Sequence, residues 1–399
     1  MNRRLKVFAL CVLVLCALLA AAATDGARPS PYLFVWSSST GPGNDFLATL
    51  DVGEGSPTYG QIVARLPVDI RRGAAHHTEH EMTPAGTLFA NLFLAGRTYL
   101  FDLRQPLAPR ILTQFDSVGP YMHPHSFVRR ANGNILATFQ MSGHGDVAPG
   151  GVIELTPSGE VLDVSPADDP NYSGYCRPYS MALVPRLDRI VSTCTDMEPA
   201  ALGGKPTQAI QIWRLSDLER LKTIDLPNGP RGVEGANSSE PRLLPDGETV
   251  LVGTFNCGLY LLKNLATASP SAELVYDFKG VFPACALSVI VDHYWIQTMG
   301  ANGPPSLVTL DIANPAKPVE VSRLELDPAN QVGPHWLARE PYGRRIVFTG
   351  GLGESRVVLG VVASDGRVTL DSHLKEPGAG KPGIVMENAV PHGAVFSIP

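Results

Sequence analysis

The sequence predicts an all-β fold, a seven-bladed β-propeller, and three observations lead to this prediction. Short segments that alternate apolar and polar residues run along the 399-residue chain, and long helical periodicity is missing. One pair of strands recurs seven times, at intervals of about fifty residues, and this spacing suits a propeller blade of four strands. Two of the repeats, 102–109 and 311–318, are close copies of each other.

The repeated unit consists of a first strand that ends in an Asp-like turn and a second strand rich in Val, Ile and Leu. The seven expected pairs are 46–51 with 61–66, 99–103 with 110–115, 151–155 with 161–164, 210–215 with 221–226, 259–262 with 273–278, 307–312 with 319–324, and 357–361 with 367–370. The 39 Gly and 35 Pro residues of the chain supply the turns that separate such short strands.

Another strand pair precedes each of these units and usually turns at a glycine, as in 129–139, 245–252 and 341–348. Seven blades are complete only if the C-terminal segment 391–399 supplies the inner strand of the last blade. The N-terminal segment 32–36 then supplies the second strand of that same blade. We expect this arrangement because it removes the open sheet edge that the ring would otherwise expose.

The first residues have the features of a secretory signal peptide: a basic start, a short apolar run and small residues at its end. We expect a signal peptide over 1–23, a linker over 24–30 and a single propeller domain over 31–399. The protein is then secreted or periplasmic, and no membrane segment remains after cleavage. The alternative is an uncleaved anchor, although the apolar run is short for a membrane span.

Composition narrows the partners and leaves the state of the cysteines open. A net charge of −6 and a pI near 5.9 give no reason to expect nucleic acid or an anionic membrane surface as a partner. Four cysteines follow the signal segment: Cys176, Cys194, Cys257 and Cys285. In an exported protein they permit disulfides, while buried free thiols fit the sequence equally well.

Histidines recur after a proline at one phase of the repeat, in 124–125, 334–335 and 391–392, and a further histidine cluster lies near this phase at 76–80. This phase corresponds to the start of the inner strand of a blade, where side chains face the central channel. Around the ring the expected occupants are His77 or His80, His125, Tyr179, Ser239, Ala284, His335 and His392. The repeat therefore predicts that imidazoles from distant segments meet at one mouth of the channel.

Several imidazoles at one point predict a transition-metal site, with copper favoured and another transition metal as the alternative. The expected ligands are His77, His80, His125, His335 and His392, and whether His76, His77 or His80 serves in the first blade stays open. Glu79 and Glu81 are either acceptors that orient the imidazoles or ordinary surface acids. The alternative for the whole motif is that Pro-His packs the channel without metal.

The segments 45–52 and 56–67, followed by Ala75-His76-His77, together with Pro124-His125-Ser126, resemble the selenium-binding protein and methanethiol oxidase family. His392 falls where that family carries a further histidine. The chain departs from the family pattern at 237–240, which reads Asn-Ser-Ser-Glu in place of His-Pro-His-Glu. It departs again at 83–86, where the family's cysteines are missing.

The resemblance implies a propeller that holds copper. In bacterial oxidases of the family it also implies O2-dependent cleavage of methanethiol to formaldehyde, sulfide and peroxide. We therefore expect an exported copper-dependent oxidase whose partners are a small thiol and O2. Two other functions fit the same residues: a non-catalytic carrier of copper or selenium, and a propeller that only binds another protein.

Overall fold

The computed structural model describes residues 29–143, 148–174, 176–198, 204–280, 284–300, 304–327, 333–350, 355–376, 378 and 380–399. The expected signal peptide (1–23) and residues 24–28 of the expected linker lie outside this range. Among the described residues there is no helix long and apolar enough to cross a membrane. The helical element among them is the short 3-10 helix η1 (Pro185–Leu187).

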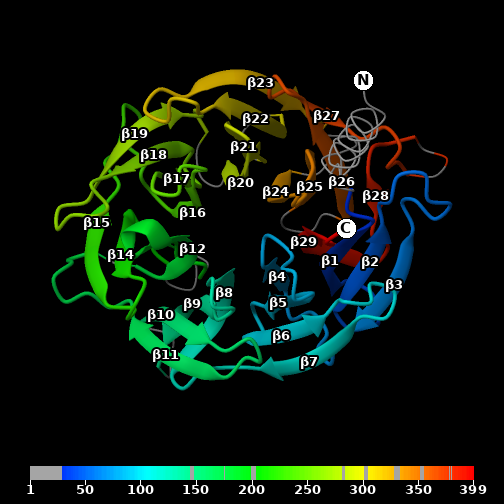
Figure 1. Cartoon of the computed structure of the whole chain (residues 1–399), viewed down its shortest axis with the longest axis horizontal. Helices are drawn as coiled ribbons and strands as arrows, with labels where there is room; N and C mark the ends of the chain where they lie inside the picture. Colours follow the sequence, from blue (N-terminus) through cyan, green and yellow to red (C-terminus); the bar gives the residue numbers. More distant parts are fainter. Residues whose placement is uncertain are drawn as a thin grey trace, which may run out of the picture.

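Seven antiparallel sheets are arranged as blades around a common central axis, so the predicted propeller is confirmed (Figure 1). The first three blades that follow one another in the chain are β4 (Ala75–Thr78), β5 (Thr87–Leu92), β6 (Arg97–Asp102) and β7 (Arg110–Phe115); β8 (Tyr121–Arg129), β9 (Ile135–Ser142), β10 (Ala148–Leu155) and β11 (Val161–Pro166); and β12 (Pro178–Val184), β13 (Arg189–Cys194), β14 (Ala209–Arg214) and β15 (Arg220–Asp225).

The next three blades follow the same order from the channel outward. They are β16 (Ser238–Leu243), β17 (Val250–Thr254), β18 (Gly258–Lys263) and β19 (Ser271–Asp277); β20 (Cys285–Val291), β21 (Tyr294–Met299), β22 (Ser306–Asp311) and β23 (Val319–Glu325); and β24 (Pro334–Arg339), β25 (Arg345–Gly350), β26 (Arg356–Val362) and β27 (Val368–Leu370), with β28 (Ile384–Val385) paired to β26. All seven predicted strand pairs are found as the third and fourth strands of a blade.

The seventh blade closes the ring as predicted, with β29 (Ala389–Phe396) innermost, then β1 (Tyr32–Ser39), β2 (Phe46–Asp51) and β3 (Ile62–Pro67). The buried ion pair between Arg345 and Glu340 of the neighbouring blade binds the backbone at the start of β1. Arg345 donates from Nη2 to the Ser30 carbonyl at 2.6 Å and from Nη1 to the Val52 carbonyl at 2.6 Å, while Glu340 accepts from the Ser30 amide at 2.6 Å. These bonds satisfy the backbone of the segment that enters the blade.

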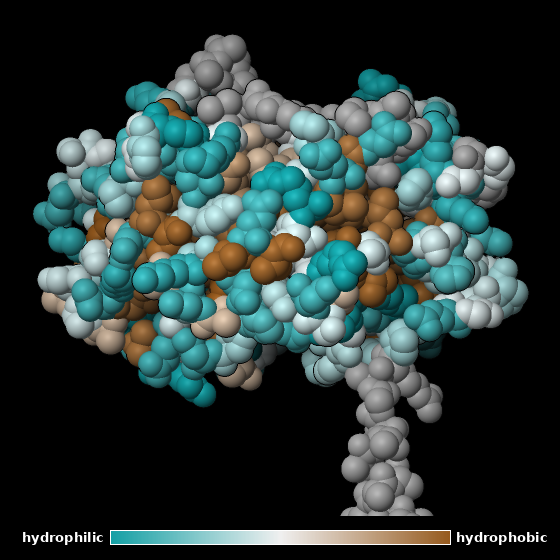
Figure 2. All heavy atoms as spheres, turned by 90° about the horizontal axis from the view of Figure 1, so that it is seen from above, coloured by the Kyte–Doolittle hydropathy of each residue, from teal (hydrophilic) through white to brown (hydrophobic). Residues whose placement is uncertain are grey.

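Apolar side chains of neighbouring blades form the core, and the four tryptophans Trp36, Trp213, Trp295 and Trp336 are fully buried in it. The outermost strands are the most exposed strands of the blades, because one of their edges has no neighbouring strand. In β7 exposed and half-buried residues alternate, and Leu112 is exposed. In the side view, apolar side chains on the rim are interrupted by polar ones (Figure 2).

Two disulfides tie the loops around the inner strands. Cys176, just before β12, is joined to Cys194 at the end of β13. Cys257, between β17 and β18, is joined to Cys285 at the start of β20 in the next blade. Of the two possibilities that the sequence left open for these cysteines, the structure shows the disulfides.

Candidate metal centre

Each of the seven inner strands has a β-bulge that begins in its first half, and the candidate site lies at these bulges. In each blade the pairing of the inner strand with its neighbour shifts register at that point, as between Ala75 and Thr78, Pro124 and Phe127, and Pro334 and Trp336. A bulge interrupts the alternation of side chains and re-aims them. Adjacent residues such as His76 and His77 can therefore both reach the cluster, and their rings stack with centroids 4.4 Å apart.

Five histidines meet at this mouth of the channel: His76 and His77 from β4, His125 from β8, His335 from β24 and His392 from β29. One ring nitrogen from each of His76, His77 and His392 lies within 4.8 Å of the other two, which is a spacing that could hold a metal ion. All three side chains are buried. The last strand in the sequence thus contributes to the same group as the first blade.

His125 belongs to the immediate surroundings of this group. Its Nε2 lies 3.0 Å from the Nε2 of His76, while its Nδ1 lies 2.8 Å from the Tyr179 carbonyl oxygen. Since a carbonyl only accepts, His125 donates from Nδ1, and the lone pair of its neutral ring is on Nε2, directed at His76. Two nitrogens bound to one tetrahedral ion would be about 3.3 Å apart, so this contact is compatible with a shared ion.

Ser126 holds two of the rings from behind. Its hydroxyl lies 3.2 Å from Nδ1 of His77 and 3.2 Å from Nδ1 of His125. The backbone of His77 is fixed as well, because its amide donates to Oδ1 of Asn91 at 2.8 Å. Such partners outside the ligand group fix the tautomer and orientation of metal-binding imidazoles.

Two ring nitrogens of the group remain free for a ligand. Within the described part of the chain, Nε2 of His77 and Nδ1 of His392 are buried and have no hydrogen-bond partner. A buried nitrogen without a partner is unfavourable by about 1–3 kcal/mol, so a native protein normally satisfies it with an ion, water or bound molecule. The residues present therefore fit a metal ion.

Burial keeps these imidazoles neutral at physiological pH. It lowers the pKa of His76, His77 and His392 well below the ordinary value, and repulsion from the neighbouring imidazoles lowers it further. The pKa of His125 falls to about 3 for the same main reason. Neutral rings offer the lone pairs that a transition metal needs, and with only nitrogen donors the set suits copper or zinc better than magnesium or calcium.

His335 lies beside this group, at the mouth. Its ring centroid is 4.8 Å from that of His392, and its side chain is partly exposed. Burial lowers its pKa to about 4. It is close enough to border a ligand at the cluster, but it is not one of the three residues whose ring nitrogens converge.

His80 follows the end of β4 and lies apart from the other predicted ligands. Its ring stacks on Trp336 with centroids 4.4 Å apart, and its centroid is 6.4 Å from that of His77. Nε2 of His80 faces the buried carboxylate of Glu240 at 3.7 Å. Of the five predicted ligands, His77 and His392 belong to the convergent group, and His125 and His335 lie against it. His80 lies outside the group, with its ring centroid 6.4 Å from that of His77.

Glu79 and Glu81 contact arginines and not the imidazoles. Glu79 accepts from Nε of Arg129 at 2.7 Å, and Glu81 accepts from Nε of Arg339 at 2.8 Å. The groups that orient the rings are Ser126 and the Tyr179 carbonyl, which the sequence did not single out for this purpose. The motif Pro124-His125-Ser126 contained a signal for Ser126, since a hydroxyl next to a channel histidine can bond a neighbouring ring.

Comparison with known proteins supports the same family as the sequence motifs. No family model matches the chain. The methanethiol oxidase of Hyphomicrobium sp is 28% identical over 346 residues, which cover 80% of this chain and 75% of that protein. The methanethiol oxidases of Danio rerio and Xenopus tropicalis are 25% and 26% identical over 232 and 238 residues. The chain spans about half the length of these two relatives, 48% in each case.

Among solved structures, a hypothetical selenium-binding protein from Sulfolobus tokodaii superposes with a TM-score of 0.75 at 20% identity, over 93% of this chain and 94% of that one. A periplasmic gluconolactonase from Pseudomonas aeruginosa superposes with a TM-score of 0.61 at 11% identity, over 92% and 99% of the two chains. These two likenesses concern the fold alone. The sequence relatives, together with the fold of the Sulfolobus tokodaii protein, confirm that this chain resembles the selenium-binding protein and methanethiol oxidase family.

Proposed function

We propose that this protein is an exported copper-dependent oxidase of a small thiol, acting at the histidine cluster where the inner strands begin. The observation that carries the proposal is the convergence of three buried, neutral imidazoles, His76, His77 and His392, with His125 in contact with the first of them. Relatives named methanethiol oxidase support a thiol as the substrate. The reaction would convert one molecule each of methanethiol, O2 and water to one molecule each of formaldehyde, hydrogen sulfide and hydrogen peroxide.

The three convergent histidines would hold the ion, and His125 or His335 would complete or border its ligand set. A bound copper ion would supply the one-electron chemistry with sulfur and O2 that no side chain at this mouth provides. The protein itself orients the rings through Ser126 and the Tyr179 carbonyl. It also keeps them neutral by burial, so that their lone pairs stay available.

Aromatic side chains around the cluster would receive the apolar part of the thiol. Tyr179 packs on His125 with ring centroids 4.0 Å apart, and Trp336 lies edge-on to His77 at 5.0 Å. Burial and the charge of Glu240 raise the pKa of Tyr179 well above its ordinary value, so its hydroxyl keeps its proton. Within the described residues that buried hydroxyl has no partner, and it would donate a hydrogen bond to a molecule bound at the cluster.

Export is supported by the two disulfides, because such bonds persist in oxidising compartments and are rare in the cytosol. The basic and apolar start of the sequence, residues 1–23, is a second argument for it. The mass of the protein recovered from the periplasm or the medium tests the proposal. Loss of the first 23 residues or so is expected, and a full-length chain retained in the cell would contradict it.

Metal analysis of the natively purified protein tests the catalytic proposal first. We expect stoichiometric copper, and release of sulfide and peroxide when methanethiol and O2 are supplied. Tyr179→Phe should keep the metal and lower kcat, because it removes only the hydroxyl. A native protein without a transition metal would refute the proposal. Copper bound tightly without turnover of any thiol would leave the carrier function in its place.

A further inference from the structure

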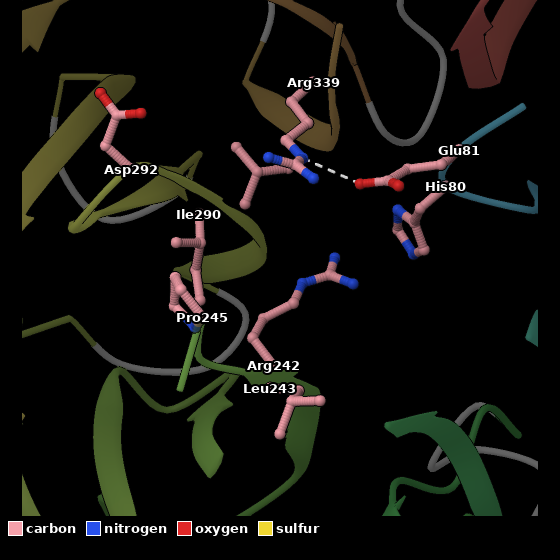
Figure 3. A pocket seen from close by; sticks show the side chains of 9 residues that line it. His80, Glu81, Arg242, Leu243, Pro245, Ile290, Asp292 and Arg339 are labelled. Atoms are coloured by element: carbon pink, nitrogen blue, oxygen red, sulfur yellow. Dashed lines mark hydrogen bonds and ion pairs between the residues drawn. The ribbon is translucent and has the colours of Figure 1, made fainter. Parts of the chain in front are cut away.

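A cavity lies beside the last residues of several inner strands, and Figure 3 shows the side chains that line it. It encloses about 510 Å³ and is lined by His80, Glu81, Arg242, Leu243, Pro245, Val289, Ile290, Asp292 and Arg339. These residues lie toward the ends of the inner strands β16, β20 and β24 or follow β4, whereas the histidine cluster lies where the inner strands begin. The two sites are therefore at opposite mouths. The volume is within the range of pockets that bind small molecules.

Two guanidinium groups extend into this cavity. In Figure 3, Arg242 reaches into the space between Ile290 and Pro245 on one side and His80 on the other, and Arg339 enters from β24. Arg242 donates from Nε to the Ser288 carbonyl at 2.9 Å, and Arg339 donates from Nε to Glu81 at 2.8 Å. In each arginine, Nε thus holds the side chain in place.

Each of the two arginines already has one carboxylate neighbour, and its remaining N–H groups are left for a ligand. Glu81 pairs with Arg339, and Asp292 pairs with Arg344, which does not line the cavity. Nη2 of Arg242 is buried 3.3 Å from the carboxylate of Glu240. Both ring nitrogens of His80 are buried as well, so they do not face the cavity. The donors that the cavity offers are therefore Nη1 of Arg242 and the two Nη atoms of Arg339, for which the described residues supply no acceptor.

The lining on the other side is mainly apolar, with the carboxylate of Asp292 beyond Ile290 (Figure 3). Leu243 and Pro245 follow Arg242 along and just beyond β16, and Val289 and Ile290 belong to β20. A bound molecule would therefore meet donors at one end and hydrocarbon at the other. Inorganic anions match only the first of these features.

We propose that this cavity binds a small organic monocarboxylate. The carboxylate accepts hydrogen bonds from Arg242 and Arg339, because a guanidinium fork matches the two oxygens of a carboxylate. Its hydrocarbon part packs on Leu243, Pro245, Val289 and Ile290. The site needs no metal and stands apart from the proposed oxidase activity, although His80 belongs to its wall and lies next to His77.

Calorimetric titration of the full purified protein with acetate, butyrate and hexanoate tests this site. Saturable binding should strengthen along the series by roughly two- to fourfold for each methylene that is buried. Hexanol, which has the same chain without the charge, should bind at least tenfold more weakly than hexanoate, because it cannot replace the charge-assisted hydrogen bonds.

Arg242→Gln and Arg339→Gln should each weaken hexanoate binding by about tenfold or more. Arg367→Gln is the matched control, since Arg367 is an exposed arginine that pairs with Asp365 away from the cavity, and it should leave binding unchanged. No saturable binding of any carboxylate, or equal binding in all three variants, would overturn the proposal. Binding of inorganic phosphate with no gain from acetate to hexanoate would also overturn it and would indicate a simple anion site.

Discussion

Ser126→Ala should weaken copper binding without unfolding the blade. The hydroxyl of Ser126 is 3.2 Å from Nδ1 of both His77 and His125. The backbone amide of this residue donates to Oγ1 of Thr138 at 3.0 Å, and that bond does not depend on the side chain. The substitution therefore removes one buried oxygen and leaves the strand pairing in place.

The magnitude follows from how differently the two rings are held. His125 keeps its orientation in the variant because its Nδ1 still donates to the Tyr179 carbonyl at 2.8 Å. Nδ1 of His77 contacts no other hydrogen-bonding group in the described part of the chain. Loss of such an outer partner lowers metal affinity by about 10- to 100-fold, and since only one ring is released we expect about tenfold, or about 1.4 kcal/mol.

Competition with a chromophoric copper chelator measures this change directly. Ser239→Ala is the matched control, because Ser239 is equally buried on an inner strand and its hydroxyl has no partner within the described residues. The control should bind copper like the parent protein. Unchanged affinity in the Ser126 variant, with thermal unfolding showing an intact fold, would refute the argument that this hydroxyl orients His77. An equal loss in both variants would refute it as well.

Three further outcomes are expected. His76→Ala should abolish stoichiometric copper binding while His80→Ala retains it, because only the first residue belongs to the convergent group. Loss of copper in His80→Ala with copper retained in His76→Ala would instead favour the ligand set expected from the sequence. Gly393→Ala should lower stability by about 1–3 kcal/mol in thermal unfolding, since an added Cβ would lie 2.9 Å from the His76 carbonyl oxygen, whereas Gly43→Ala, with open space around it, should change nothing. A reductant should lower the unfolding midpoint in denaturant, because the two disulfides join residues 18 and 28 apart and each contributes about 3–4 kcal/mol; an unchanged midpoint would show that they do not stabilise the fold.

The fold was predictable because each blade has the same local sequence pattern of strands and turns. Alternation, turn residues and a constant interval identify strands one blade at a time, and closure by 32–36 with 391–399 follows from counting blades. The phase of the Pro-His segments then placed His125, His335 and His392 at one mouth. These inferences depend only on sequence distance along a regular repeat.

The identity of the convergent ligands depends on irregular geometry and was not predictable in the same way. Regular alternation would direct His76 and His77 to opposite faces of β4, and only the bulge between Ala75 and Thr78 allows both to reach the cluster. His80 follows the end of β4, further along the channel and beyond the reach of the cluster. A shift of a few residues in register decides between these positions, and turn spacing does not fix it.

The placement of His392 on β29 bears on the order of events during biosynthesis. A nascent chain with its early blades already folded would carry His76, His77 and His125 but not the third convergent imidazole. That ring arrives only when β29, the last strand of the described chain, docks beside β1, the first, a contact between residues at least 350 positions apart. Metal binding would therefore follow closure of the propeller, and a chain that stops folding before this step would lack the third convergent histidine.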